Sequence, residues 1–145
     1  MNVYGTPPAP ELPRLERAVR RALTASPVRL TRSQAEALVE GMLGVACTRG
    51  WTLYACAVMA NHVHVVIGVA GDPDPSNVMR DLKGYGSRAL NARWGGGGAR
   101  RWWTRSGSHR VLRGEPHVIA AIRYVRAQYR PLVIRVAPEL PEAWR

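Results

Sequence analysis

The chain has 145 residues, of which 46% are hydrophobic, so it can bury the core of one domain and is not disordered throughout. Its 21 lysines and arginines against 10 acidic residues give a formal charge of +11, and every one of these cations except Lys83 is an arginine. Arginine binds phosphate and stacks on bases, so the charge favours a nucleic-acid partner, although a high-GC genome that encodes arginine by default would leave the same surface.

Cysteine content and hydropathy exclude several classes of protein. Cys47 and Cys56 are too few for a disulfide framework or a cysteine-rich zinc site, and both are expected to pack as small hydrophobic residues. The sequence has no apolar segment of membrane-spanning length and no signal pattern at its start. We therefore expect a cytoplasmic protein that does not contact a membrane.

The chain divides into three parts by composition. Residues 1–27 are rich in proline and arginine and predict an N-terminal extension. Residues 28–131 carry the regular hydrophobic patterns of one domain, which opens with a very short strand at 28–30. Residues 132–145 contain two prolines and are expected to form a peripheral tail.

The first half of the domain predicts a helix followed by a pair of strands. Thr31 and Gln34 have the spacing of a capping box, and Gly50 is placed to end the helix that follows. Residues 51–58 and 62–69 are rich in β-branched and apolar residues and are separated by a short connection. They are expected to pair as antiparallel neighbours.

A second helix is predicted from Ser76, as its N-cap, to about Trp94. Its inner stripe is apolar, and its cations lie outside that stripe, where they either face solvent or contact phosphate. The overall charge favours phosphate. These cations include Arg80, Lys83 and Arg88.

A run of glycines at 95–98 predicts a hinge or an exposed loop, and residues 101–112 predict a strand or hairpin. This segment contains Arg101, Trp102, Trp103 and Arg105. Arginine and tryptophan together suit base stacking and backbone contact, although strand alternation would bury one of the two tryptophans.

The last helix opens at Gly114-Glu115-Pro116 and is expected to end near Pro131. Tyr129 falls on its apolar face and is assigned to the core, whereas Tyr124 and Gln128, four residues apart, share another face. Helices mixed with a hairpin in this order predict an α+β fold, one antiparallel sheet packed with helices.

His62 and His64 are the residues in this sequence most suited to chemistry. Side chains alternate along a strand, so both imidazoles point to one face, either as solvent-facing side chains or as half of a metal site. An amide oxygen of Gln128 would supply a third ligand, and this mixed set suits Mg or Mn, while imidazole also accepts Zn, Co or Ni. A tyrosine is a weak nucleophile at neutral pH, and a divalent ion that polarises a phosphate oxygen would lower its barrier.

Three separated motifs resemble those of one family. Residues 59–66, Met-Ala-Asn-His-Val-His-Val-Val, resemble the HUH signature (histidine, bulky hydrophobic, histidine) of the single-tyrosine transposases, which include insertion-sequence and REP-associated tyrosine transposases. Residues 108–112, Ser-His-Arg-Val-Leu, and 122–128, Ile-Arg-Tyr-Val-Arg-Ala-Gln, resemble their final strand and catalytic helix. The likeness covers about residues 28–130.

The resemblance implies a ferredoxin-like α+β fold, usually dimeric, with Tyr124 as nucleophile and His62, His64 and Gln128 as ligands of Mg or Mn. The implied reaction is cleavage and rejoining of single-stranded DNA with hairpin or palindromic ends, through a 5′-phosphotyrosine and a free 3′-OH. The basic helix face and the tryptophan segment are then the candidates for holding DNA. These residues are Arg80, Lys83, Arg88, Arg101, Trp102, Trp103 and Arg105.

Two alternatives remain open from the sequence. The family usually begins with a clear first strand, whereas residues 1–30 here are rich in proline and arginine. That departure motivates a non-catalytic, DNA-binding remnant of the same family. The other alternative is a metal- or RNA-binding α+β module in which the histidine pair is incidental.

Overall fold

The computed structural model describes residues 29–95, 102–103 and 107–145. The expected strand at 28–30 is not seen, because Arg29 and Leu30 belong to no strand and Val28 lies outside these residues. In chain order the elements are α1 (Arg32–Arg49), β1 (Thr52–Val58), β2 (Val63–Gly68), α2 (Pro75–Trp94), α3 (Glu115–Arg126), β3 (Val133–Val136) and a 3₁₀ turn at Glu142–Trp144. The predicted α+β class, an antiparallel sheet packed with helices, is confirmed.

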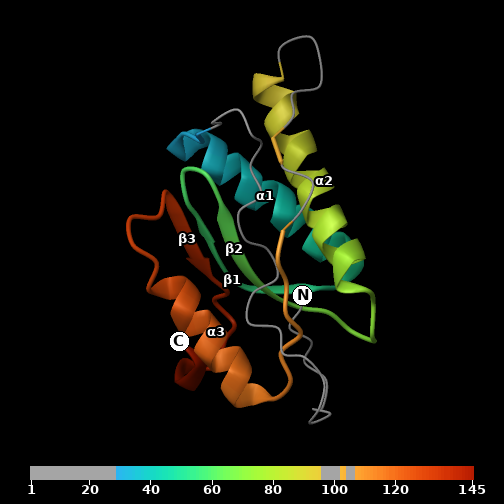
Figure 1. Cartoon of the computed structure of the whole chain (residues 1–145), viewed down its shortest axis with the longest axis vertical. Coiled ribbons are helices and arrows are strands. Elements are labelled where there is room, and N and C mark those ends of the chain that lie inside the picture. Colours follow the sequence, from blue (N-terminus) through green and yellow to red (C-terminus); the bar gives the residue numbers. More distant parts are fainter. Residues whose placement is uncertain (1–28, 96–101, 104–106) are drawn as a thin grey trace.

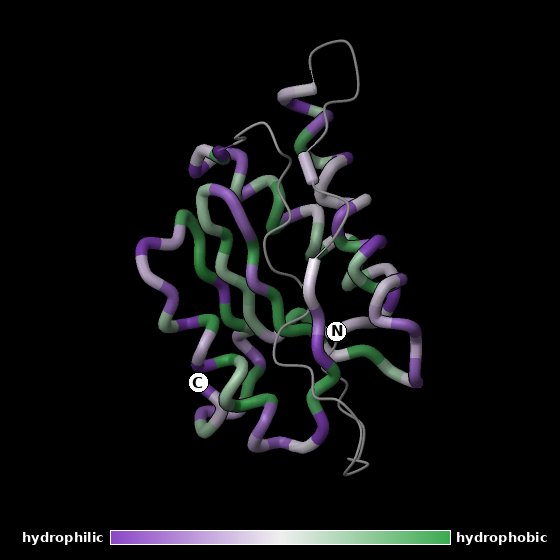
Figure 2. The backbone as a smooth tube through the Cα atoms, in the orientation of Figure 1, coloured by the Kyte–Doolittle hydropathy of each residue, from purple (hydrophilic) through white to green (hydrophobic). Residues whose placement is uncertain are grey.

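The described strands form one antiparallel sheet in the order β2-β1-β3. α3 packs on one face of this sheet, and α1 packs on the other face with α2 beside it (Figure 1). Figure 2 shows that hydrophobic residues are concentrated along the strands. Every residue of β2 is buried, and a fully buried aliphatic side chain contributes about 1.5–3 kcal/mol to the free energy of folding. The hairpin is therefore the centre of the core.

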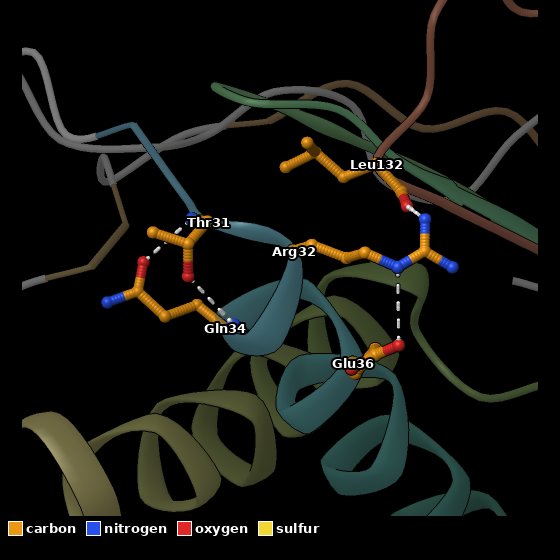
Figure 3. Close-up of polar contacts among 5 residues, drawn as sticks. All are labelled: Thr31, Arg32, Gln34, Glu36 and Leu132. Carbon is orange, nitrogen blue, oxygen red and sulfur yellow. Dashed lines mark hydrogen bonds and ion pairs between the residues drawn. The ribbon is translucent and has the colours of Figure 1, made fainter.

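The start of α1 is fixed by the predicted capping box. The Thr31 hydroxyl accepts from the Gln34 backbone N–H at 3.2 Å, and the Gln34 side chain accepts from the Thr31 N–H at 2.9 Å (Figure 3). The Arg32 guanidinium also donates to the Leu132 carbonyl at 3.2 Å, just before β3. Gly50 ends the helix in the left-handed region, with φ 72°. The N-terminus of α1 is thus joined to the segment directly before β3.

α1 and α2 approach each other closely at two glycines. A Cβ at Gly41 would lie 2.8 Å from the Tyr85 carbonyl oxygen, and a Cβ at Gly86 would lie 2.4 Å from Leu38 Cδ1. The main chain moves less easily than the tip of a side chain. A side chain at Gly41 is therefore harder to accommodate than one at Gly86, although its distance is longer. By contrast, a Cβ at Gly44, in the same helix, would meet nothing within 4 Å.

The second helix begins earlier than the sequence predicts. Its N-cap is Asp74, whose carboxylate accepts from the Ser76 N–H at 2.9 Å, and Pro75 occupies the first helical position. Proline is favoured there because its missing N–H needs no partner and its φ is already helical. The predicted N-cap, Ser76, therefore lies two residues after the observed one.

The C-terminal third differs most from expectation. Residues 132–145 are not a peripheral tail, because β3 pairs with β1 and Ala137 and Leu140 are buried. α3 ends at Arg126 and not near Pro131, and the residue before the proline, Arg130, is outside the helical region with φ 55°. Residues 107–113 form no strand, and Trp103 forms only an isolated bridge.

Two smaller findings complete the fold. Cys56 is buried as expected, and burial raises the pKa of its thiol to about 12, although nearby Arg135 lowers it. Cys47 is exposed, so the expectation that it packs as a small hydrophobic residue is wrong. Among the helices of the described residues, none combines the length and apolar character needed to cross a membrane.

We expect Gly41→Ala to lower the free energy of unfolding by about 1–3 kcal/mol, because the added methyl forces α1 away from α2. Gly44→Ala is the matched control on the same helix, and it should raise that free energy by about 0.5–1 kcal/mol, because the alanine meets open space and disfavours the unfolded chain. Urea unfolding of the three proteins measures both effects. Equal changes in the two variants would contradict the close contact.

Candidate active site

The two histidines come together through the β1–β2 connection. His62 precedes β2, and the tight turn before it is closed by a bond from the Met59 N–H to the His62 carbonyl at 2.8 Å. His64 lies within β2 opposite Ala57 and is buried, while His62 is half-buried. Their ring centroids are 4.9 Å apart with planes at 87°. The predicted pairing of the imidazoles on one face is present.

Asn61 fixes the tautomer of His62. Its side-chain oxygen Oδ1 lies 2.8 Å from His62 Nδ1. An amide oxygen can only accept, so Nδ1 is the donor in this pair, and in the neutral ring the lone pair then lies on Nε2. From the sequence, Asn61 is expected only as part of the connection between the two strands. The signal for its role was its place directly before a histidine, since asparagine side chains commonly bond to neighbouring groups in turns.

Tyr124 lies beside His64 but belongs to a different element. It lies on α3, and its ring centroid is 5.6 Å from that of His64 with the planes at 83°. Its side chain is 45% exposed, so the phenol borders both the buried imidazole and solvent. The contact forms within one chain. The nucleophile predicted from the sequence is therefore adjacent to a predicted histidine ligand.

Gln128 lies beyond the helix that was expected to carry it. α3 ends two residues earlier, and the Gln128 side-chain Nε2 donates to the Tyr124 carbonyl at 3.0 Å. The same carbonyl also accepts from the Ala127 N–H at 3.3 Å, so it takes two bonds at the helix end. Gln128 and Tyr124 are thus joined by a hydrogen bond and not by a shared helical face, and the Oε1 atom is the Gln128 group suited to a cation.

The distance between the two imidazole rings allows both of them to bind a single cation. With metal–nitrogen bonds of about 2.1 Å and angles of about 90–110°, two ring centroids lie about 4.6–5.4 Å apart. The observed 4.9 Å falls in this range. Nowhere in residues 29–95, 102–103 and 107–145 do three or more His, Cys, Asp or Glu side chains gather for a metal. Oxygens of an amide or of a bound phosphate would therefore complete the coordination.

The residues expected to contact DNA fall into three groups. Arg80 and Arg88 are exposed on α2 and Lys83 is half-buried there, and the Arg80 guanidinium lies 3.8 Å from Asp81. Arg101 and Arg105 lie outside the described residues. The remaining group is the tryptophan pair.

Trp102 and Trp103 are buried, which differs from the base-stacking role expected for them. The Trp102 Nε1–H donates to Asn91 Oδ1 at 2.9 Å, and the Trp103 Nε1–H donates to the Lys83 carbonyl at 3.0 Å. Both indoles therefore anchor their segment to α2, and neither offers an open face to a base. The prediction was wrong because each ring lies in an apolar site where its N–H has a polar partner. Alternation along a strand would bury only one of two adjacent residues.

A profile of the IS200-like transposases matches residues 26–128, which is more than half of the chain. The chain belongs to the IS200-like transposase family. This match includes both histidines, Tyr124 and Gln128, and it confirms the family inferred from the three motifs. No curated protein sequence matches the chain.

The fold is similar to that of a solved structure, a REP-associated tyrosine transposase bound to a REP hairpin. The TM-score is 0.56 at 19% sequence identity, and the match covers 73% of this chain and 61% of that one. At this identity the likeness concerns the fold alone. This member of the family spans about three fifths of the length of that protein.

We expect Asn61→Ala to release the tautomer of His62. Without the amide acceptor the imidazole should populate both neutral forms, and long-range nitrogen–proton NMR should show a loss of the Nδ1-protonated pattern. Asn61→Asp is the matched control, because its carboxylate retains an acceptor at the same place. An unchanged pattern in Asn61→Ala would show that another group orients the ring.

Proposed function

We propose that this chain cleaves and rejoins single-stranded DNA through a 5′-phosphotyrosine on Tyr124. The observation that carries the proposal is the convergence of three rings, with His62 4.9 Å from His64 and His64 5.6 Å from Tyr124, in a member of the IS200-like transposase family. A nucleophile beside two potential ligands is the arrangement that a metal-assisted attack on phosphate requires.

In the proposed reaction, the ester bond between phosphorus and the 3′-oxygen is exchanged for one between phosphorus and the Tyr124 oxygen. The Tyr124 oxygen attacks a backbone phosphorus, its proton passes to solvent, and the bond from phosphorus to the 3′-oxygen breaks. The 3′-oxygen leaves as a hydroxyl after it takes up a proton. Rejoining is the reverse, with the 3′-hydroxyl attacking the phosphotyrosine, so no external energy source is needed. The 45% exposure of Tyr124 leaves room for a strand to approach.

The proposed cofactor is Mg or Mn, held by the Nε2 atom of His62, an imidazole nitrogen of His64 and the Oε1 atom of Gln128. When bound, the ion would neutralise charge on a phosphate oxygen and so favour attack by a phenol. The chain's own contribution is orientation. Asn61 sets the tautomer of His62, and the bond from Gln128 to the Tyr124 carbonyl holds that side chain at the end of α3.

The proposed substrate is single-stranded DNA with a hairpin or palindromic end, and the proposed working unit is a homodimer. The similar solved structure holds a REP hairpin, and the net charge of +11 here suits a polyanion. Arg80, Lys83 and Arg88 on α2 are the proposed phosphate contacts within the described residues. Arg101 and Arg105 stay in the proposal as sequence-based candidates.

Removal of the Tyr124 hydroxyl should abolish covalent capture of DNA. The wild-type protein, incubated with labelled hairpin single-stranded DNA and Mn²⁺, is expected to form an adduct that survives denaturant, and Tyr124→Phe is expected to form none. Tyr129→Phe removes the other exposed phenol hydroxyl of this segment and should retain the adduct. An adduct on Tyr124→Phe would refute the assignment. DNA binding without any wild-type adduct would instead indicate the non-catalytic remnant.

Loss of one histidine should separate cleavage from binding. We expect His64→Ala to lower the cleavage rate at least about 100-fold, because the proposed ion loses a ligand, while affinity for single-stranded DNA changes by less than about threefold, since arginines supply the phosphate contacts. His109→Ala, an exposed histidine outside the site, should change neither quantity. Circular dichroism checks that the variants are folded. An equal loss of cleavage and affinity in His64→Ala would contradict the separation.

A further inference from the structure

The exposed large hydrophobic side chains of the described residues gather in one short part of the chain. They are Tyr124, Tyr129 and Ile134, with 45%, 77% and 40% of their surfaces exposed. Tyr129 was expected in the core, and that expectation is wrong because α3 ends before it. The catalytic function proposed above explains only Tyr124. The exposure of the other two therefore needs its own explanation.

Ile134 lies on the face of the sheet that carries the proposed site. Ala57 of β1 is opposite His64 of β2 on one side and opposite Ile134 of β3 on the other. Directly opposed residues of antiparallel strands point to the same face, so His64, Ala57 and Ile134 form one row across the sheet. Ala57 and His64 are buried where α3 packs on the sheet, whereas Ile134 at the end of the row is 40% exposed.

Tyr129 lies on the connection that runs from α3 to β3. This connection starts just after Tyr124 and ends at Leu132, whose N–H donates to the carbonyl of Val58 at 2.8 Å. Val58 is the last residue of β1 and directly precedes the turn that carries His62. The connection therefore returns to the end of the sheet at which the β1–β2 turn lies (Figure 1).

Tyr129 lies beside an arginine, in a part of the sequence without acidic residues. The Arg130 guanidinium carbon lies 5.3 Å from the centre of the Tyr129 ring, and Arg130 holds a left-handed φ of 55°, which is costly for a residue with a side chain. No aspartate or glutamate occurs between Glu115 and Glu139. That interval carries Arg123, Arg126, Arg130 and Arg135. An exposed aromatic ring beside an arginine suits a nucleobase next to a phosphate. The positive charge disfavours an apolar protein partner that has few acidic residues.

We propose that Tyr129 stacks on an unpaired base of the single strand, next to the phosphate that Tyr124 attacks, with Arg130 beside the backbone and Ile134 extending the apolar surface. This inference rests on the proposed function and adds a subsite for the substrate to it. The ring supplies a flat surface, the arginine supplies charge, and Ile134 is the exposed end of the row that begins at the buried His64. Stacking accepts any base, so this subsite selects unpaired over paired nucleotides.

The test compares two DNA probes without cleavage. One is a hairpin with a single-stranded thymidine extension that contains 2-aminopurine, and the other is the same hairpin without the extension, both in EDTA. Tyr129→Ala should weaken binding of the extended probe about 5- to 150-fold and should leave the blunt probe within about twofold. The fluorescence change of 2-aminopurine on binding should be lost with it. Thermal unfolding should stay unchanged because the ring is exposed.

Tyr129→Phe is the matched variant, because it keeps the ring and loses only the hydroxyl. Retention of affinity and of the fluorescence change in Tyr129→Phe supports stacking, and a loss equal to that of Tyr129→Ala overturns it. An equal loss of Tyr129→Ala on both probes, or no loss on either, also overturns the inference. These readouts use no cleavage, so failure of the adduct experiment and failure of the stacking experiment are distinguishable.

Discussion

The register between β1 and β2 is the constraint on which the candidate site depends. It places His64 opposite Ala57 on the face covered by α3, and a shift by one residue would turn His64 toward α1. The register is in turn set by burial, since every residue of β2 is removed from solvent and its apolar side chains must fill both faces. Small residues complete the arrangement, because alanines at 55, 57 and 121 are buried between the sheet and the helix. Packing of the core and placement of the imidazole are therefore one requirement.

The site combines a local part with a distant part. The histidines and Asn61 are held by a tight turn and need only their own neighbours, whereas Tyr124 arrives on a helix from the far part of the sequence. Gln128 connects to this second part through the main chain of Tyr124. The phenol, the imidazoles and the carboxamide are thus positioned by different elements. The packing of α3 on the sheet is what brings them together.

Features governed by local chemistry were predictable from the sequence. The capping box at Thr31, the paired strands and the shared face of the histidines all follow from spacing over a few residues, and the structure contains each of them. Features decided by tertiary contacts were not predictable. The burial of Trp102 depends on Asn91 in α2, and β3 depends on an open edge of β1, which no pattern within residues 132–145 reveals. Tyr129 was misplaced because helical periodicity was extended past Arg126, where α3 ends.

The position of β3 after α3 has a consequence for synthesis on the ribosome. The hairpin of β1 and β2 joins residues close in sequence and can form while later residues are still being added. The contact of Tyr124 with His64 forms only after α3 has emerged from the ribosome. The bond from Leu132 to Val58 forms later still. An unfinished chain that stops before α3 therefore has its imidazole pair without its phenol. The complete set of side chains is assembled only after α3 and Gln128 have been synthesised.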